Sequence, residues 1–483
     1  MKITKHLIGA CALAVGLAAP VHAQDIEKEF EEFKKQQLQE FDEFKNKADA
    51  DFETFLREAW KKYDAFAPIP APVRPEPPQP VEFDKTKPAL PPVAVKPGKV
   101  KVPEARPFVP VKVEVPEVKP TGKPVRRIPV LFYGTTFEVA SDAVDMLSLE
   151  GNKESDVADA WKDVCNKDYE QLLKDCLTIK QEKRLSDWAY LLFIKQLGIE
   201  LYGQGRPDEV AFLQMFLLNK SGYKARLAKI DDRLKLLVAT NSTIYATPYL
   251  TMDGDRYYVF EPAPNGSMGI YTYRKNFADA RNLVSLDISG MPGFDMQDYT
   301  RELVSANGQL KVQAVVNKNL IDFYHDYPQC DVITHYKTPM SEELAESIYP
   351  ALRAAVAGKS QKDAANLLLH FVQTAFDYKT DGEQFGYEKP NFPDETFYYP
   401  FCDCEDRAML YSTLVKELLG LDAILLDYPN HIASAVCFTE DIAGDYVVLD
   451  DGRKYLICDP TYIGAPIGAC MDQYKNVSPE IIR

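Results

Sequence analysis

The sequence is poor in histidine, tryptophan and long apolar runs, and it lacks an excess of positive charge. Six histidines and three tryptophans occur among 483 residues, and the formal net charge is −16. A protein this acidic repels phosphate, which argues against a nucleic-acid-binding surface. Beyond the first residues, no stretch approaches the roughly 18 apolar residues of a membrane-spanning helix. No metal, nucleotide or cofactor motif is visible, so we expect no cofactor and no transmembrane segment in the mature chain.

The first 23 residues have the layout of a cleavable secretory signal. Two lysines precede an apolar stretch at residues 7–19, and the small-residue site Val21-His22-Ala23 follows it. We therefore expect cleavage after Ala23 and a periplasmic, cell-surface or secreted protein. Lipid attachment at Cys11 is disfavoured because the apolar stretch before it is too short. Export would leave eight cysteines in a compartment that permits disulfides.

Residues 24–66 contain no proline or glycine and carry aromatic residues in pairs that recur every eleven positions. Eleven residues make three turns at about 3.67 residues per turn, so the rings fall on one stripe of a helix. The pattern predicts an amphipathic helix over 24–66, whose stripe packs against a second copy, against the body of the protein or against a partner. The paired aromatics are Phe30 and Phe33, Phe41 and Phe44, Phe52 and Phe55, and Tyr63 and Phe66.

Between residues 68 and 129 lie 18 of the 34 prolines, interspersed with lysine, valine and glutamate. This composition cannot bury a core and favours an extended polyproline-II segment. We expect residues 67–124 to be an extended linker. It would serve either as a stand-off arm or as a plain tether.

The remaining chain contains a distant internal repeat at a constant offset of 198. Asp208 aligns with Asp406, Gly222 with Gly420, and the register continues through Asp253-Gly254 and Asp451-Gly452. A gapless register of this length indicates two copies of one α+β unit, a helix packed on an antiparallel sheet; the alternative is coincidence. We expect a first lobe at 125–281, a β-rich connector at 282–339 with strands in LVSLDIS, QLKVQAVV and LIDFYHDY, and a second lobe at 340–483.

In the second lobe, helical periodicity covers 340–378, a loop follows at 380–399, and an amphipathic helix is predicted over 404–419, ended by Gly420. Strands are predicted at 422–426, 431–438, 446–449 and 454–459. Cys404 then occupies the first turn of a helix, where unpaired N–H groups and the dipole stabilise a thiolate. His431 begins a strand after a turn, and Asp459 ends a later strand where it can orient an imidazole.

The segments CDCEDRAMLYSTLVKELLGLDA, NHIASAV and CDPTYIGAP resemble the transglutaminase-like superfamily, whose fold is related to papain. The resemblance covers about residues 340–468 and keeps the order Cys, His, Asp. It implies that Cys404 is the nucleophile, His431 the base and Asp459 the orienting residue. The family usually reads Gly-x-Cys-x-Asp, and Cys402 stands here in place of the glycine. Cys402 is either a redox-sensitive partner of Cys404 or a passive replacement.

Other residues near the motif have weaker roles. Asp406 is expected to complement the helix dipole or to support the scaffold. The oxyanion would be held by the Cys404 backbone N–H and a side chain of the preceding loop, for which we choose Gln384. A zinc site is disfavoured, because the spacing of its potential ligands matches no closed zinc pattern; these ligands would be Cys402, Cys404, His431, Cys437 and Cys458.

At the same offset, the first lobe has Arg206, Arg233 and Glu261 in place of Cys404, His431 and Asp459. Arginine is neither a nucleophile nor a base at ordinary pH, so the first lobe is predicted to be non-catalytic. Together these features predict an exported thiol enzyme that acts on amide bonds of peptides or proteins. With water as acceptor it is a peptidase or amidase, favoured by family-level analogy; with a lysine amine it is a transglutaminase. A non-catalytic binding scaffold is the alternative of another class.

Overall fold

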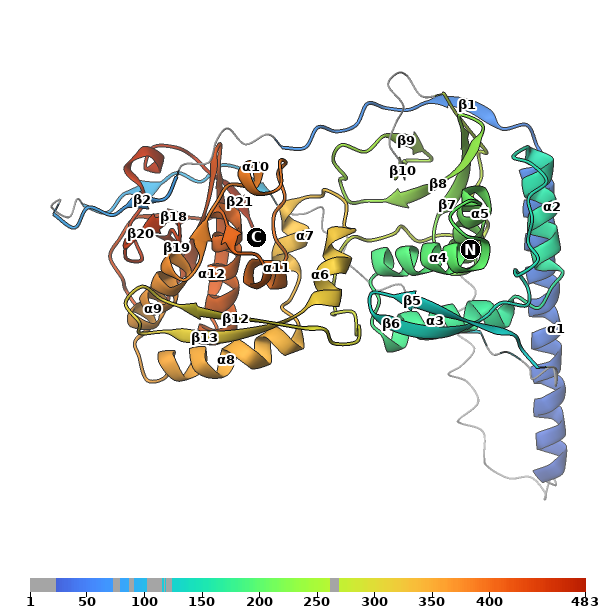
Figure 1. Cartoon of the computed structure of the whole chain (residues 1–483), viewed down its shortest axis with the longest axis horizontal. Coiled ribbons are helices and arrows are strands. Elements are labelled where there is room, and N and C mark those ends of the chain that lie inside the picture. Colours follow the sequence, from blue (N-terminus) through green and yellow to red (C-terminus); the bar gives the residue numbers. More distant parts are fainter. Residues whose placement is uncertain are drawn as a thin grey trace, which may run out of the picture.

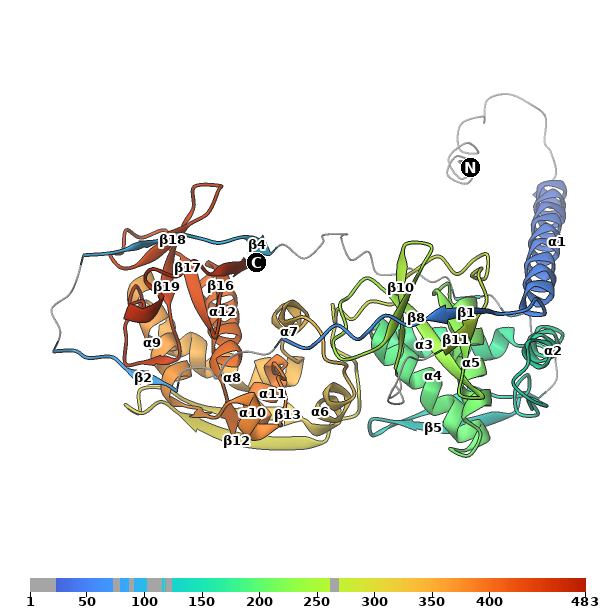
Figure 2. The same cartoon turned by 90° about the horizontal axis from the view of Figure 1, so that it is seen from above.

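The computed structural model describes residues 23–72, 79–86, 91–101, 115–116, 118, 124–260 and 269–483. Two lobes lie side by side, and a long N-terminal helix extends past the first lobe (Figures 1 and 2). The expected signal segment, apart from Ala23, lies outside the described residues, as do Cys11 and Glu261. The chain mixes helices with mostly antiparallel sheets, which is an arrangement of the α+β kind.

The first lobe consists of a hairpin, four helices and a curled sheet. The hairpin is β5 (Arg127–Phe132) and β6 (Thr135–Ala140). The helices are α2 (Glu154–Cys165), α3 (Glu170–Glu182), α4 (Asp187–Tyr202) and α5 (Pro207–Lys220). The strands of the sheet are β7 (Ala225–Ile230), β8 (Arg233–Thr240), β9 (Tyr249–Met252), β10 (Asp255–Val259) and β11 (Gly269–Thr272).

The second lobe has the same plan with additional short elements. Its helices are α8 (Glu342–Val356), α9 (Gln361–Thr374), α10 (Asp381–Gln384), α11 (Pro393–Tyr398), α12 (Cys404–Leu419) and the short 3-10 helix η1 (Asp472–Tyr474). Its main strands are β16 (Asp422–Tyr428), β17 (His431–Cys437), β18 (Tyr446–Val448), β19 (Lys454–Cys458) and β21 (Glu480–Ile482). Small pairing elements are β14 (Asp377–Tyr378), β15 (Phe401–Cys402) and β20 (Tyr462–Ile463).

The two sheets share their strand order and their register. The first sheet runs β9-β10-β8-β7-β11 and the second β18-β19-β17-β16-β21. Ala225 pairs with Val238 in the first lobe, and Ala423 pairs with Val436 in the second. The next pair across, Leu237 with Val259, likewise matches Ala435 with Ile457. All of these pairs are related by the offset of 198 found in the sequence; descent from one duplicated unit stays a prediction.

The connector between the lobes is only partly a β structure. The hairpin β12 (Asp298–Val304) and β13 (Lys311–Asn317) contains the QLKVQAVV strand, so that part of the prediction is confirmed. The LIDFYHDY prediction is wrong: this segment forms α6 (Lys318–His325), because the side chain of Asn317 caps a helix there. A further helix, α7 (Val332–Lys337), follows.

The LVSLDIS segment, residues 283–289, is also not a strand. Its alternating apolar residues, including Val284 and Leu286, are buried, which satisfies the pattern that suggested a strand. However, its backbone bonds to side chains: Ser285 N donates to Asp187 Oδ2 at 3.1 Å, and Asp287 N to Ser285 Oγ at 3.0 Å. One backbone bond, from Val284 N to Ala239 O at 2.8 Å, is not continued into a ladder, so the alternation reflects packing.

The proline-rich region contradicts the expectation of a free arm or tether where it is described. Short strands β2 (Val81–Glu82), β3 (Ala94–Val95) and β4 (Val100–Lys101) pair with β20, β18 and β21 of the second lobe. We call residues 61–72, 79–86 and 91–101 the strap; it runs from the first lobe to the second (Figures 1 and 2). Edge strands of both sheets offer unpaired backbone groups, and pairing with them overrides the preference of the segment for a solvated helix.

The N-terminal helix is shorter than the sequence pattern predicts. Helix α1 (Ala23–Leu56) ends before the last aromatic pair, and Tyr63 lies in strand β1 (Lys61–Asp64), which pairs with β11. Phe66 N donates to Tyr249 O at 2.8 Å, on the opposite edge of the same sheet. The C-terminal part of α1 packs on the first lobe, where the Phe52 ring lies 4.7 Å from Trp161. In contrast, Phe33 is 55% exposed.

The α12 prediction is confirmed: the helix covers residues 404–419, and Gly420 ends it in the left-handed conformation. The strand predictions for 422–426, 431–438, 446–449 and 454–459 are confirmed to within two residues. The long helical stretch at 340–378 is instead two helices, α8 and α9, because Gly358 with φ +71° separates them. The predicted loop at 380–399 contains the short helices α10 and α11.

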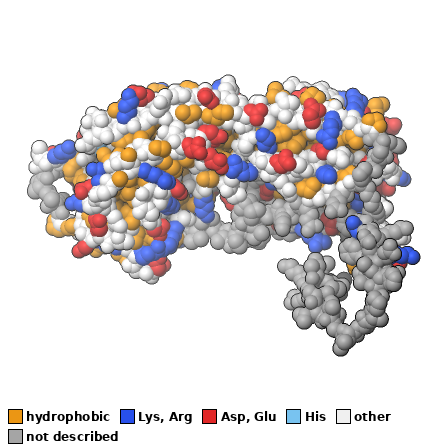
Figure 3. Space-filling model, turned by 90° about the horizontal axis from the view of Figure 1, so that it is seen from below, with side chains coloured by type: hydrophobic (Ala, Val, Ile, Leu, Met, Phe, Trp, Pro, Cys, Tyr) orange, Lys and Arg blue, Asp and Glu red, His pale blue; other side chains and the backbone are white. Residues whose placement is uncertain are grey.

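The described helices, the molecular surface and the cysteines add three further observations. Among the described helices, none combines the length and the apolar composition needed to cross a membrane. Figure 3 shows one face of the molecule, on which acidic, basic and apolar side chains are interspersed. All eight cysteines of the described part of the chain are free thiols in this structure.

Candidate active site

Cys404 is the first residue of α12, and its position depends on the residues around the helix start. Asp403 is the N-cap, and Asp406 closes a capping box by accepting from Asp403 N at 3.3 Å. Asp406 also accepts from the backbone and side-chain amides of Asn391, both at 2.8 Å. The expected supporting role of Asp406 therefore has a geometric basis: it ties the loop before the helix to the helix start.

His431 and Asp459 form a buried pair on the neighbouring sheet. His431 begins β17, Asp459 follows β19, and His431 Nε2 lies 2.8 Å from Asp459 Oδ2. The second carboxylate oxygen of Asp459 accepts from Thr461 N at 2.9 Å. His431 Nδ1 is buried and makes no hydrogen bond among the described residues. A proton on Nε2 would satisfy the carboxylate, and this tautomer leaves the lone pair of Nδ1 as the basic site.

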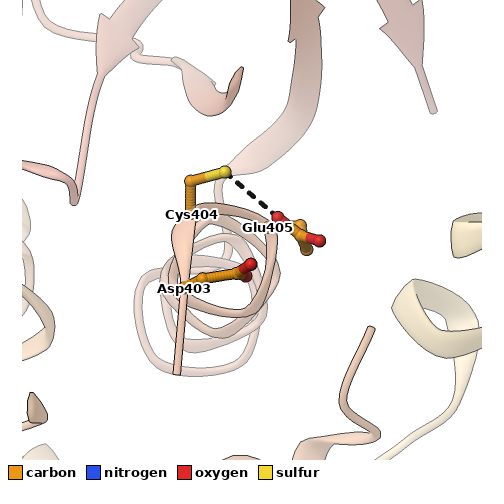
Figure 4. Close-up of side chains that lie close together, drawn as sticks. All are labelled: Asp403, Cys404 and Glu405. Atoms are coloured by element: carbon orange, nitrogen blue, oxygen red, sulfur yellow. Dashed lines mark hydrogen bonds between the residues drawn. The ribbon is translucent and has the colours of Figure 1, made fainter. Parts of the chain in front are cut away.

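The Cys404 thiol lies beside an acidic side chain. Sγ donates to Glu405 Oε2 at 3.0 Å, and Figure 4 shows this contact at the start of the helix, next to Asp403. Cys404, Glu405 and His431 all have an exposed fraction of 0%. Helix α12 packs directly on β17, where Ser434 Oγ donates to Ala408 O at 2.9 Å. The thiol and the imidazole thus come from two elements that are fixed against each other.

Buried carboxyl groups gather next to Cys404. Burial, followed by the neighbouring charge of Glu405, raises the pKa values of Asp381 and Asp406. Burial and the same neighbour raise the pKa of Asp403 as well. Like charges this close cannot all ionise in a low dielectric, so protons or a cation must balance them. Asp381, Asp403 and Asp406 hold oxygens within 4.8 Å of one another, a donor set that suits a hard cation such as Ca²⁺.

Aromatic rings cover the imidazole. The Tyr474 ring stacks on His431 with centroids 5.1 Å apart and an interplanar angle of 16°, and its hydroxyl donates to Asn430 Oδ1 at 2.9 Å. The Tyr428 ring lies 6.3 Å from the imidazole centroid and 4.6 Å from the Tyr474 ring. These rings, together with the burial of His431, separate the imidazole from solvent in this structure.

The remaining predicted residues have different environments. Cys402 is buried in β15, and burial raises the pKa of its thiol to about 11, so it is an inert neutral group in this state. Gln384 lies at the end of α10, partly exposed. Among the described residues, the zinc set Cys402, Cys404, His431, Cys437 and Cys458 does not form a cluster with metal-ligand spacing.

The first lobe uses the equivalent positions for surface ion pairs. Arg206 is the N-cap of α5, and its guanidinium bonds to Glu209 and to the Leu147 carbonyl at 2.8 Å. Arg233 begins β8 and contacts Asp208 at 3.1 Å, with half of its side chain exposed. The Arg206 guanidinium thus takes the position of the Cys404 thiol, and the Arg233 guanidinium takes the position of the His431 imidazole.

Two features near the site were missed from the sequence. Gln373 of α9 is buried and holds the loop that carries Asp459. Its only sequence signal was a polar residue on an apolar helix face.

A second thiol–imidazole pair, Cys330 and His335, lies 3.7 Å apart in the connector. Burial lowers the pKa of His335 to about 3 and raises that of Cys330 to about 12, so this pair is neutral and unsuited to nucleophilic chemistry.

A cavity of about 200 Å³ lies between the lobes. Its wall includes Tyr245 of the first lobe, Pro72 of the strap, and Tyr327 and His335 of the connector. Glu388 also lines it and lies within 4.8 Å of the carboxyl oxygens of Asp381 and Glu405. The cavity therefore adjoins the acidic group that contacts the Cys404 thiol.

No family model, curated protein or solved structure matches this chain.

Proposed function

We propose that the chain is an exported thiol enzyme that cleaves amide bonds of peptides or proteins, built on a papain-related, transglutaminase-like lobe. The observation that carries the proposal is the buried His431–Asp459 pair, 2.8 Å apart, on the sheet that packs against the helix begun by Cys404. A buried imidazole bonded to a carboxylate through one nitrogen, with the other nitrogen unbonded, is the arrangement that a general base requires. The signal-like layout of the first 23 residues supports the proposed export.

The reaction divides into two steps. The thiol proton of Cys404 passes to His431 Nδ1, and Sγ attacks the carbonyl carbon of the amide. The imidazolium then protonates the leaving amine as the C–N bond breaks, which produces a thioester. Water, deprotonated by the same imidazole, attacks the thioester and releases the carboxylic acid and the thiol. Asp459 holds the ring and stabilises its charged form.

The helix start also supplies oxyanion stabilisation. The first N–H groups of α12, that of Cys404 among them, point toward the start of the helix, where the helix dipole favours a negative charge. Gln384 would donate from the loop side. Glu405 opposes the first step while it is ionised, because a carboxylate beside the sulfur disfavours a thiolate. The rate should therefore depend on how the acidic group around Asp403 is neutralised.

The cavity between the lobes is the proposed substrate entrance. Its aromatic walls and the nearby carboxyl groups suit an extended peptide segment, and its route to the thiol passes Glu388 and Glu405. The first lobe contributes Tyr245 to this wall, which gives a non-catalytic copy a role in substrate binding.

The test is cysteine-directed labelling combined with peptide-library cleavage. Iodoacetamide near pH 6 should alkylate Cys404 at a rate that depends on His431, which takes the thiol proton, so this rate should fall in His431→Ala while the rates at the other seven thiols of the described chain stay the same. Cleavage should disappear in Cys404→Ala. A Cys404 rate that is unchanged in His431→Ala, together with no cleavage, would favour the binding-scaffold alternative. Incorporation of a labelled primary amine in place of cleavage would instead identify a transglutaminase, which uses the same three residues.

A further inference from the structure

The loop that carries Asp459 is held from one side by a single amide. Gln373 Nε2 donates to the carbonyl oxygens of Asp459 at 3.3 Å, Tyr462 at 2.8 Å and Ala465 at 3.1 Å. Its Oε1 accepts from Gly464 N at 3.2 Å. Gln373 is buried at the C-terminal end of α9, so these four contacts lie in a low dielectric where they are costly to lose.

The strap holds the same loop from a second element. Strand β2 pairs in parallel with β20, and Phe83 N donates to Ile463 O at 2.9 Å. The Phe83 ring meets Tyr462 edge to face, with centroids 5.3 Å apart. Residues 459–465 are therefore fixed by a helix of their own lobe and by a segment that lies about 380 residues earlier in the chain.

Three further contacts fix the strap to the sheet of the second lobe. Val95, in β3, is buried in a small core that also contains Ile457 and Tyr455 of β19. Beyond it, Gly98 N donates to Pro479 O at 2.8 Å, and Ile481 N donates to Lys99 O at 2.9 Å. The approach at Gly98 is close: a Cβ there would lie 2.6 Å from Pro479 O. The strap thus pairs with both edge strands, β18 and β21, of the sheet that carries His431.

We propose that Gln373 and the strap are positioning elements for the His431–Asp459 pair, so that the proline-rich segment is part of the active centre. This inference rests on the proposed thiol chemistry. Asp459 orients the imidazole only while its loop stays in place, and a displacement of about 1 Å can cost about 100-fold in rate. Release of the strap would loosen the loop without removing any reacting group.

The direct test compares Gln373→Met, Phe83→Ala and Gly98→Val with the control Lys99→Ala, whose side chain is exposed. Gln373→Met keeps the volume and removes the hydrogen bonds. Each of the three variants should lower kcat by about 10- to 100-fold, with KM changed by less than about 3-fold, and should shift the acidic limb of the pH profile. A purely structural role would lower Tm and leave the pH profile and kcat of the folded fraction unchanged, and that result would overturn the proposal.

A second readout separates this proposal from the proposed function. In a ¹⁵N-histidine-labelled sample, the His431 Nε2 proton should give a downfield resonance from its bond to Asp459, which is absent in Asp459→Ala. Loss or broadening of that resonance in Gln373→Met and Gly98→Val, but not in Lys99→Ala, supports positioning even if no substrate is cleaved. An unchanged resonance in both variants contradicts it, whatever the activity of the wild type.

Discussion

The two lobes differ most where α5 and α12 begin, although the sheets behind these helices share strand order and register. The first lobe starts its helix with Arg206 and Pro207, in a partly exposed segment. The second starts with Cys404 and Glu405, both fully buried among further carboxyl groups. Pro207 at the first helical position and an accessible guanidinium stabilise the start of α5. A thiol among buried carboxyl groups lowers the stability of the start of α12. Because buried groups that cost stability are typical of functional sites, this contrast supports the proposal that the second lobe carries the chemistry.

Away from the helix start, the two lobes share a small separate core beside the sheet. Tyr257 and Val259 in the first lobe correspond to Tyr455 and Ile457 in the second, and each pair belongs to a small separate core. Strap residues complete both cores: Tyr63 packs against the first, and Val95 is buried in the second. Architecture is therefore shared between the lobes, and the difference is concentrated at the helix start and the strand ends beside it.

The largest effect is expected from the His431–Asp459 pair of the second lobe. His431→Ala and Asp459→Asn should each lower kcat/KM for peptide cleavage by about 10³-fold or more, because the base is lost or held in the wrong tautomer. The equivalent change in the first lobe, Arg233→Ala, should leave kcat/KM unchanged. Cleavage assays on all three variants provide the measurement. A loss of activity in Arg233→Ala that matches the loss in His431→Ala would break the distinction between the lobes.

A smaller effect, on stability, is expected at Arg407. This buried guanidinium donates to Gln373 O at 3.3 Å and to Phe376 O at 2.7 Å, in the element that supports the site. Arg407→Met should lower the free energy of unfolding by about 3 kcal/mol, since it leaves buried carbonyls without donors. Its equivalent in the first lobe, Glu209→Gln, should cost less than about 1 kcal/mol, because the Arg206–Glu209 pair is partly exposed. Urea unfolding measures both values; similar losses would contradict the difference in burial and bonding.

The acidic group predicts a pH dependence of stability. Burial raises the pKa values of Asp381, Asp403 and Asp406 above those of the unfolded chain. Such groups stabilise the fold fully below the unfolded value, about 4, and this stabilisation is lost as the pH rises through the folded value. The Tm should therefore fall from pH 5 to pH 9, and less steeply in Asp381→Asn. The scans are run in chelator so that no cation replaces the protons; a Tm that rises with pH in wild type would show that the acids are not buried together.

The smallest effect is expected at the surface pairs of the first lobe. Arg233→Ala removes a contact with Asp208 at a side chain that is half exposed. The cost should be at most about 1 kcal/mol and should shrink in high salt. A cost above about 2 kcal/mol in thermal unfolding would indicate that Arg233 has a structural role that its exposure does not suggest.

Local signals in the sequence identified the elements around the site well. Helix α12 has the predicted bounds, because Gly420 ends it and an apolar stripe defines it. The strands that carry His431 and Asp459 were also found, since alternation and turn residues mark them. The offset of 198 recurs in the pairing of both sheets.

Predictions failed where tertiary contacts override local preference. Tyr63 continues a helical stripe in sequence but pairs with β11 as a strand, and the prolines before β3 and β4 gave no sign of their sheet partners. Gln373 and Glu405 were missed because a lone polar residue does not reveal which distant backbone or thiol it contacts. Contacts between residues tens to hundreds of positions apart leave no periodic signal in one sequence.

The measurement that tests the central claim most directly is peptide-library cleavage by the wild type, Cys404→Ala and Cys402→Ala in parallel. Both cysteines are buried, and they lie two positions apart, so the comparison separates a nucleophile from a passive neighbour. We predict that Cys404→Ala abolishes cleavage and the covalent acyl adduct, while Cys402→Ala retains both. Full cleavage by Cys404→Ala would contradict the assignment of this lobe as a thiol enzyme.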